Sequence, residues 1–373
     1  MSILMSLLLF LQFIGGLGLL IFGAELLVRG ASRLAAALGM SSLVIGLTVV
    51  AYGTSAPELA VCLKAALSNQ SDIALGNVIG SNISNILLTL GLTAVIRPLL
   101  VSRQLIRFDV PVMIGFSVLV LVLGQDHAIS RSDGSILFAS FILYTFWLIR
   151  QGHKQSEEDE SLLSEKITRD NSATMPRGIR NAIFILGGLV LLVLGARWLV
   201  DAAVAMARSF GLSELIIGLT IIAVGTSLPE IATSIVAAAR GSRDLVTGNL
   251  IGSNISNLLI ILGLTAMLSP RGVKVAPAAL HFDIPVMIAA AVACLPIFFT
   301  KRRVGRVEGA VFVLYYLAYI VYLVLAASAH DALEPFSNIM MWFVIPLTVI
   351  TLLMALFRSL KEERSNSQTL PPS

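Results

Sequence analysis

The stretch GLTVVAYGTSAPE, residues 46–58, occurs a second time in this chain as GLTIIAVGTSLPE, residues 218–230. The similarity extends outward on both sides, because residues 41–92 align with residues 213–264 without a gap and 29 of the 52 positions are identical. The chain therefore contains an internal duplication. Its architecture has to be worked out as one unit and its copy.

Each copy continues into a second shared motif, which reads GNVIGSNISN at 76–85 and GNLIGSNISN at 248–257. Further along, FDVPVM at 108–113 is matched by FDIPVM at 282–287. The duplicated unit is therefore several helices long.

The composition excludes a soluble protein, because 57% of the residues are hydrophobic, 13% are charged and the mean hydropathy is +0.90. A helix needs about 20 mostly apolar residues to cross a bilayer core of about 30 Å. A transmembrane β-barrel would instead show short segments of alternating polarity, which this sequence lacks. We therefore predict an all-α polytopic membrane protein with about 11 spans. The charge-free runs that define them are 1–24, 34–57, 73–96, 110–125, 134–149, 181–196, 215–229, 245–270, 284–300, 309–330 and 335–357.

The repeats divide the chain into two units of five spans each, at 1–150 and 179–327. Because five is an odd number, the second unit must enter the membrane upside down relative to the first, an arrangement typical of secondary transporters. Between the units lies a polar cytoplasmic linker, 151–178, which is predicted to be solvated and partly disordered. A further transmembrane helix at 335–358 and a cytoplasmic tail at 359–373 follow the second unit.

The basic residues are distributed by membrane side. If the N-terminus is outside, 20 of the 26 lysines and arginines lie on the cytoplasmic side, as the positive-inside rule requires. The sequence predicts a multi-pass protein of the plasma membrane, or of the inner membrane in a Gram-negative cell, with its C-terminus in the cytoplasm. The net charge of +4 is then a feature of topology, and no nucleic-acid partner is expected. The partner is the lipid bilayer, and the oligomeric state stays open.

Two carboxylates, Glu58 and Glu230, fall inside predicted spans, where an ionised residue costs of order 3 kcal/mol and faces a polar cavity. Each follows a proline, Pro57 or Pro229, which removes a helical hydrogen bond and predicts a break near mid-span. Hydroxyls, freed carbonyls and carboxylates are all oxygen ligands, which suit Ca²⁺ and Na⁺ rather than Zn²⁺ or Cu⁺. Two glutamates from inverted helices would place a formal charge of −2 near the membrane centre, which one divalent cation neutralises.

The second motif places small and polar residues on one helical stripe in each repeat. On this stripe Ser81, Asn85, Ser253 and Asn257 are predicted to coordinate ions, whereas Gly76, Gly80, Gly248 and Gly252 are predicted to allow close helix packing. Asn77 and Asn249 fit either ion coordination or hydrogen bonding to the broken helix. Asn82 and Asn254 lie off the stripe and are predicted to join helices. Asp109 and Asp283, each two residues before a proline, are predicted to cap helices.

The two paired motifs closely resemble the α-repeats of the calcium/cation antiporter superfamily, particularly prokaryotic Na⁺/Ca²⁺ exchangers, over roughly residues 5–327. The resemblance implies four ion sites between two inverted five-helix units, and alternating access in which the first and sixth spans slide across a rigid core. It also implies these ligands: Ala51 (carbonyl), Thr54, Ser55, Glu58, Ser81, Asn85, Ala223 (carbonyl), Thr226, Ser227, Glu230, Ser253 and Asn257. Some members of the superfamily carry aspartate where this chain has Asn257, so the ion coupling and stoichiometry stay open.

The sequence therefore predicts a secondary active antiporter that exchanges Na⁺ for Ca²⁺. A Ca²⁺/H⁺ antiporter is the alternative, K⁺ involvement stays open, and a passive cation channel is a third class. An enzyme with Ser55 or Ser227 as nucleophile is not expected, because no His or Lys lies at a comparable depth to act as base. No cofactor is expected beyond the transported ions.

Overall fold

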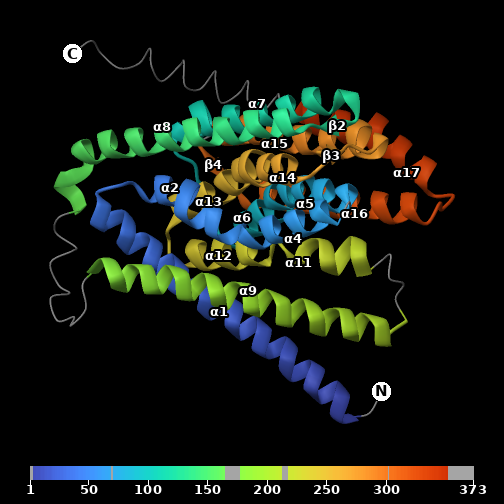
Figure 1. Ribbon diagram of the computed structural model, residues 1–373, viewed down its shortest axis with the longest axis horizontal. Helices are drawn as coiled ribbons and strands as arrows, with labels where there is room; N and C mark the ends of the chain where they lie inside the picture. The colour runs from blue at the N-terminus through green and yellow to red at the C-terminus, as the bar shows by residue number, and fades with distance from the viewer. Residues whose placement is uncertain (1–2, 69, 164–176, 212–216, 301, 352–373) are drawn as a thin grey trace.

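The computed structural model describes residues 3–68, 70–163, 177–211, 217–300 and 302–351. The described chain is almost entirely helical (Figure 1), as the hydropathy predicted. The first unit comprises α1 (Ile3–Leu38), α2 (Ser42–Ile45), η1 (Gly46–Val50), α3 (Ala51–Thr54), α4 (Ala56–Leu67), α5 (Ser71–Ile83), η2 (Ser84–Leu90), α6 (Gly91–Ile96), η3 (Leu105–Asp109), α7 (Val110–Leu123), η4 (Gly124–Asp126) and α8 (Arg131–Leu163). The second comprises α9 (Arg177–Ser209), η5 (Gly218–Ile222), α11 (Ala223–Gly225), α12 (Leu228–Ala239), α13 (Arg243–Ser256), η6 (Asn257–Ile261), α14 (Leu262–Leu268), η7 (Ala279–Asp283), α15 (Ile284–Phe299) and α16 (Arg306–Ala327).

Within the described ranges, nine helices are long and apolar enough to cross a membrane, and a bent pair, Ser42–Thr54 and Ala56–Leu67, makes a tenth. The remaining predicted span is the second broken helix. Its described part includes the shorter apolar helix Leu228–Ala239, and residues 212–216 before it lie outside the described ranges. The polytopic all-α fold is confirmed.

The predicted breaks lie at Ser55 and Ser227. Their backbone angles (φ −83°, ψ 6° and φ −84°, ψ 2°) depart from the helix at the same position of each copy. In the first copy the two halves bend by 44°. The next helix begins with a proline in its first turn, where the missing N–H costs nothing.

Two short antiparallel strand pairs join the repeats and show their relative orientation. β1 (Leu99–Leu100), which precedes α7, pairs with β4 (Arg303–Val304), which follows α15. β2 (Ala128–Ile129), which follows α7, pairs with β3 (Val273–Lys274), which precedes α15. The start of α7 therefore lies beside the end of α15, and the end of α7 lies beside the start of α15. These equivalent helices are antiparallel, so the repeats are inverted.

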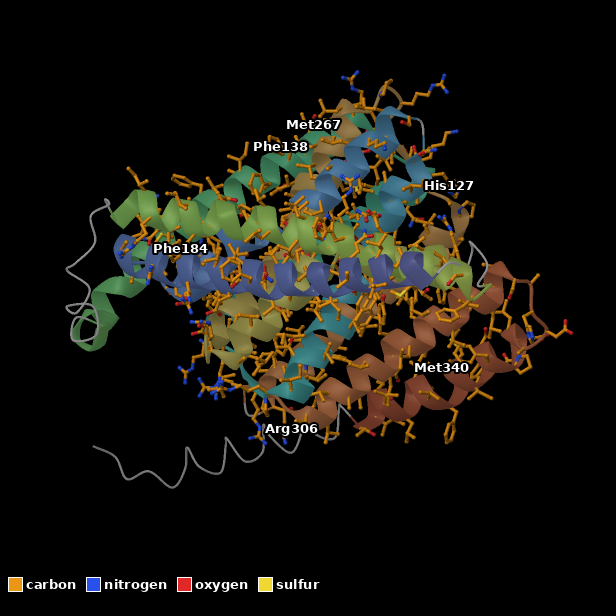
Figure 2. All side chains as sticks on the ribbon, turned by 90° about the horizontal axis from the view of Figure 1, so that it is seen from below. His127, Phe138, Phe184, Met267, Arg306 and Met340 are labelled. Carbon is orange, nitrogen blue, oxygen red and sulfur yellow. The ribbon has the colours of Figure 1, made fainter. Side chains whose placement is uncertain are left out.

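The first helices of the two units, α1 and α9, cross and pack against each other through their middle portions (Figures 1 and 2). Glycines allow the backbones to approach closely. A Cβ at Gly16 would lie 2.7 Å from the amide nitrogen of Leu199, and one at Gly23 would lie 2.8 Å from the carbonyl oxygen of Gly188. A larger residue at either position would force the helices apart, so these two helices form one closely packed pair.

The prediction of close packing at the motif glycines is correct in one repeat and wrong in the other. At Gly248 a Cβ would lie 2.6 Å from the carbonyl oxygen of Leu43, and at Gly252 it would lie 2.6 Å from that of Leu47. At Gly76 and Gly80, a Cβ would meet no described atom within 4 Å. The first broken helix therefore lies against both glycines of α13, whereas neither glycine of α5 has a described neighbour at that distance.

The capping prediction for the two aspartates is wrong. Asp109 and Asp283 have helical backbone angles and make no capping hydrogen bond, because the turns η3 and η7 already precede them in the same helix. Instead, Tyr144 donates to Asp109 Oδ1 (3.0 Å) and Tyr319 donates to Asp283 Oδ1 (2.9 Å). Each carboxylate joins two successive spans of its own unit.

Two regions outside the five-span units are described in part, the predicted linker and the predicted added helix. α8 continues to Leu163, so helix occupies the first part of the predicted linker, and residues 164–176 lie outside the described ranges. After the second unit, α17 (Leu333–Ile339) and η8 (Met340–Val344) begin a helix that is described to Thr351. α17 buries no residue, and Tyr315 of α16 donates to Thr348 (2.6 Å). This added helix lies against the last helix of the second unit; the predicted tail is not described.

Candidate ion-binding site

The two intramembrane glutamates lie at equivalent positions in the first turns of α4 and α12, immediately after the helix breaks. Each is 1% exposed. The Ser55 hydroxyl of the first break donates to Glu230 Oε1 of the second unit at 3.3 Å. The two breaks therefore face each other across the centre of the protein, as the inverted duplication predicts.

Threonines and asparagines hold each broken helix against the motif helix of the other unit. The Thr54 hydroxyl donates to Asn249 Oδ1 (3.2 Å), and the Thr226 hydroxyl donates to Asn77 Oδ1 (3.3 Å). The two bonds are related by the repeat offset of 172 residues. For Asn77 and Asn249, the structure thus shows hydrogen bonding to the opposite broken helix. The threonine oxygens keep lone pairs that a cation can use.

Around the glutamates lie buried oxygens that have no hydrogen-bond partner among the described residues. Such an atom costs about 1–3 kcal/mol, and a bound cation would satisfy it. Single buried hydroxyls elsewhere, such as those of Thr93 and Thr265, also have no partner in the described part of the chain. The set around the glutamates differs from these because its oxygens cluster beside two carboxylates. The unpaired oxygens of the predicted ligands are Glu58 Oε2, Ser81 Oγ, Asn85 Oδ1, Ser227 Oγ, Glu230 Oε2, Ser253 Oγ and Asn257 Oδ1.

The predicted carbonyl ligands lie in the half-helices that precede the breaks. Ala51 begins α3, and its carbonyl oxygen accepts the Ser55 amide at 3.1 Å. Ala223 begins α11, the equivalent segment of the second unit. Every predicted ligand thus lies on one of the two broken helices or on the two motif helices that cross them.

Two features of the site escaped the sequence reasoning. The motif helices change to π-helical turns at Ser84–Leu90 and Asn257–Ile261, which contain the predicted ligands Asn85 and Asn257. Such turns are common at functional sites, but periodicity of 100° per residue cannot reveal them. Asn82 and Asn254 join the two motif helices, as predicted. The second feature is that Asn82 accepts a hydrogen bond from the predicted ligand Asn257, and Asn254 accepts one from the predicted ligand Asn85. Their identity in both copies of the motif was the available signal.

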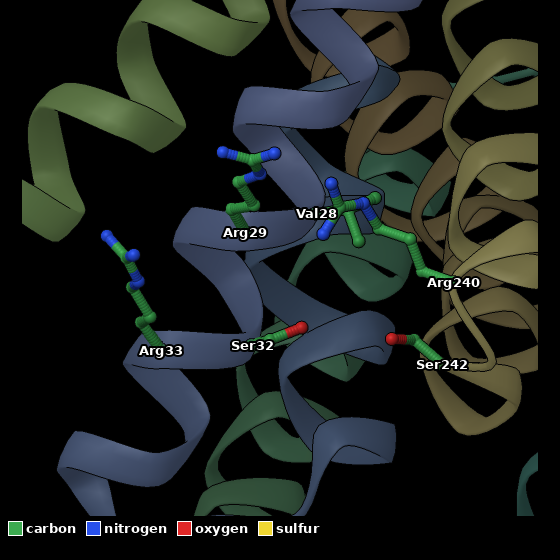
Figure 3. A pocket seen from close by; sticks show the side chains of 6 residues that line it. All are labelled: Val28, Arg29, Ser32, Arg33, Arg240 and Ser242. Carbon is green, nitrogen blue, oxygen red and sulfur yellow. The ribbon is translucent and has the colours of Figure 1, made fainter. Parts of the chain in front are cut away.

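A polar pocket of about 420 Å³ lies elsewhere, between α1 and the end of α12 (Figure 3). Arg29, Arg33 and Arg240 line it, and Glu25 pairs with Arg29 (2.6 Å) and Arg240. Three guanidinium groups against one carboxylate repel cations. The chemistry therefore favours the glutamate cluster as the cation site, although that cluster is enclosed.

Comparisons with known proteins show which family this chain resembles. Residues 8–150 and 180–325 match the family model described as sodium/calcium exchanger protein. The chain is 33% identical over 344 residues to the sodium/calcium exchanger MaX1 of Methanosarcina acetivorans, an alignment that spans 84% of this chain and 98% of that protein. It is 41% identical over 276 residues to the inner membrane protein YrbG of Escherichia coli, across 73% of this chain and 83% of that protein.

A solved structure of the sodium–calcium exchanger NCX_Mj resembles the fold with a TM-score of 0.72. The sequences are 30% identical, and the match covers 85% of this chain and 99% of that one. The family-model match falls into two segments, 8–150 and 180–325, which nearly coincide with the two units found by sequence duplication.

Proposed function

Because the chain belongs to the sodium/calcium exchanger family, we propose that it is a secondary active antiporter that exchanges Na⁺ for Ca²⁺ across the membrane. The observation that carries this proposal is the cluster of buried, unpaired oxygens around Glu58 and Glu230. Hard cations prefer an all-oxygen donor set of this kind. The proposed ligands are the twelve residues that the resemblance implies.

The charge of the site supports exchange of these two ions at one place. Two ionised glutamates are neutralised by one Ca²⁺ or by two Na⁺, so the ions compete for the same carboxylates. Neither loaded state then carries an isolated buried charge, whereas an empty site does. Because of this penalty, the protein should change the side to which the site opens only when ions are bound. This is the condition for coupled exchange.

We propose that access alternates by movement of the α1–α9 pair across the other spans. Its close glycine packing supports movement of the two helices as one body. We also propose that the N-terminus lies outside and the C-terminus inside, because this orientation places 20 of the 26 lysines and arginines on the cytoplasmic side. Labelling single introduced cysteines near residues 70 and 242 with an impermeant thiol reagent tests this. Protection of the first and labelling of the second in whole cells would contradict the topology.

Flux of ⁴⁵Ca²⁺ into proteoliposomes that carry an outward Na⁺ gradient tests the function. Wild-type protein should concentrate Ca²⁺ against its gradient. Glu58→Gln and Glu230→Gln should each lower the initial rate by more than about 100-fold, because removing a partner of a metal ligand already costs 10–100-fold in affinity and these changes remove the ligand charge itself.

Asp201→Asn is the matched control, since Asp201 is an exposed carboxylate on α9 that pairs with Arg197 (3.8 Å). It should exchange at the wild-type rate. Uptake driven by a pH gradient without Na⁺ would assign the site to Ca²⁺/H⁺ exchange instead. Uptake that only equilibrates Ca²⁺ would indicate a channel, and repeating the assay with and without K⁺ tests K⁺ coupling.

A further inference from the structure

We propose that Asn82 and Asn254 are positioning residues, which determine the atom that Asn85 and Asn257 present to the ions. The proposal rests on the proposed ion site. An asparagine side chain has an oxygen that can bind a cation and an NH₂ group that repels one. A ligand asparagine therefore works in one of its two amide orientations, and something must select that orientation.

The selecting contacts cross between the two units. Asn257 Nδ2 donates to Asn82 Oδ1 at 3.0 Å, and Asn85 Nδ2 donates to Asn254 Oδ1 at 3.4 Å. All four asparagines are 1% exposed. With their NH₂ groups engaged in this way, Asn85 and Asn257 each keep an Oδ1 atom without a hydrogen-bond partner among the described residues. These are the oxygens proposed to bind the ions.

Asn82 is itself held in one orientation by its neighbours. Its Nδ2 donates to the backbone oxygen of Asn254 (3.3 Å) and to Met287 Sδ (3.5 Å). A flip of the Asn82 amide would place its NH₂ group against the NH₂ group of Asn257. It would also place its oxygen against two acceptors, the Asn254 carbonyl and the Met287 sulfur. Every contact would become unfavourable, so the observed orientation is locked.

Asn254 has an equivalent but weaker lock. Its Nδ2 donates to Met113 Sδ at 3.5 Å, while its Oδ1 accepts from Asn85 at 3.4 Å. Met113 and Met287 are buried, and they end the FDVPVM and FDIPVM flanks that the duplication retains. A role for these repeated methionines follows: each provides a soft acceptor behind a positioning asparagine.

The test is a double-mutant cycle on the ⁴⁵Ca²⁺ half-saturation constant of Na⁺-driven uptake. Asn82→Ala should raise that constant by about 10- to 100-fold, the range for loss of a residue that orients a metal ligand. In an Asn257→Ala background, Asn82→Ala should raise it by less than about twofold, because the side chain that it orients is absent. In an Asn85→Ala background, it should have its full effect.

Asn254→Ala should show the reverse pattern, with its effect lost in the Asn85→Ala background and retained in the Asn257→Ala background. Asn82→Ser and Asn254→Ser extend both cycles with smaller polar side chains. Thr93→Val is the control, since Thr93 is a buried residue about three turns along the same span and belongs to neither the site nor these contacts.

Equal effects of Asn82→Ala in both backgrounds would overturn the positioning role, because general damage to the helix interface does not depend on which ligand remains. If Asn82→Ala protein is not recovered as a single species by size exclusion, the Asn254 cycle decides on the same criterion. Absence of Na⁺-driven flux in the wild type would instead contradict the proposed function, so the two failures are distinguishable.

Discussion

The two motif helices, α5 and α13, are nearly identical where they face the broken helices, yet their surroundings differ. Gly248 and Gly252 of α13 are buried against the backbone of the first broken helix. Gly76 of α5 is exposed and Gly80 is partly exposed, and a Cβ at either would meet no described atom. The same sequence is thus packed tightly at Gly248 and Gly252, which we call the closed contact, and has no described neighbour within 4 Å at Gly76 and Gly80, which we call the open contact.

Hydrogen bonds from Arg97 reinforce the closed end of the protein. The equivalent position of the second repeat cannot make them. Arg97 donates to the carbonyl oxygens of Ala238 and Ala239, at the end of α12 (2.9 and 3.0 Å). The residue 172 positions after Arg97 is Ser269, which cannot replace a guanidinium. With the proposed ion site between the two ends, the tighter packing lies on the side that the proposed topology places in the cytoplasm. Alternating access then requires the open and closed contacts to exchange.

The largest expected effect comes from Gly252→Ala, which attacks the closed contact. The added Cβ would lie 2.6 Å from Leu47 O and 2.7 Å from Leu47 Cα, which are backbone atoms that cannot turn aside. We expect this conformation to lose about 1–3 kcal/mol. Thermal unfolding of the detergent-purified protein measures the loss. An unchanged melting temperature would show that the contact is looser than described.

Gly80→Ala is the matched change at the open contact and should have the opposite sign on stability. The alanine meets no described neighbour, and helix propensity favours it by about 1 kcal/mol over glycine. If the two contacts exchange during transport, however, it would clash in the other state. We therefore expect a protein at least as stable as the wild type that exchanges ⁴⁵Ca²⁺ about tenfold more slowly. A ⁴⁵Ca²⁺ exchange rate equal to that of the wild type would contradict the proposal that the open and closed contacts alternate during transport.

A smaller effect is expected at the tyrosine–aspartate hydrogen bond that each unit contains, because the aspartate is more deeply buried in the first unit than in the second. Tyr144→Phe leaves the fully buried Asp109 without its tyrosine donor, whereas Tyr319→Phe does so for the half-buried Asp283. We expect Tyr144→Phe to cost about 1–3 kcal/mol and Tyr319→Phe about 1 kcal/mol, because water can reach the second carboxylate. Equal shifts in the melting temperature would show that both carboxylates have the same access to water.

The smallest effect is expected from Glu25→Gln, which removes the carboxylate partner of Arg240. Arg240 lies at the closed end, beside α1 (Figure 3). The pair is partly exposed, so it contributes up to about 1 kcal/mol to this conformation. Opening of the closed end should become up to about fivefold more frequent, as measured by thiol labelling of a cysteine placed at Ser242. Arg197→Gln, at the position related to Glu25 by the repeat, is the control and should leave that labelling unchanged.

Much of the fold and of the candidate site followed from particular residues. Glu58 and Glu230 were identified because ionised side chains are rare inside spans, and their breaks followed from Pro57 and Pro229. The aspartate caps were wrong, because the preceding π-helical turn of Asp109 extends its helix backwards and left no free amide to cap. A proline two residues later carries no information about that turn.

The sequence by itself determined the polytopic fold, the duplication and the inversion that an odd number of spans imposes, and it predicts an ion site made of oxygens. These depend on hydropathy, on the chemistry of single residue types and on counting, which are local properties of the chain. Only the tertiary structure decided that Gly252 is buried against a backbone while Gly80 is partly exposed, and that the NH₂ group of Asn257, and not its oxygen, is bonded to Asn82. Two nearly identical copies have the same local preferences, so any difference between them, like the direction of an amide, is decided by the neighbours that each copy meets.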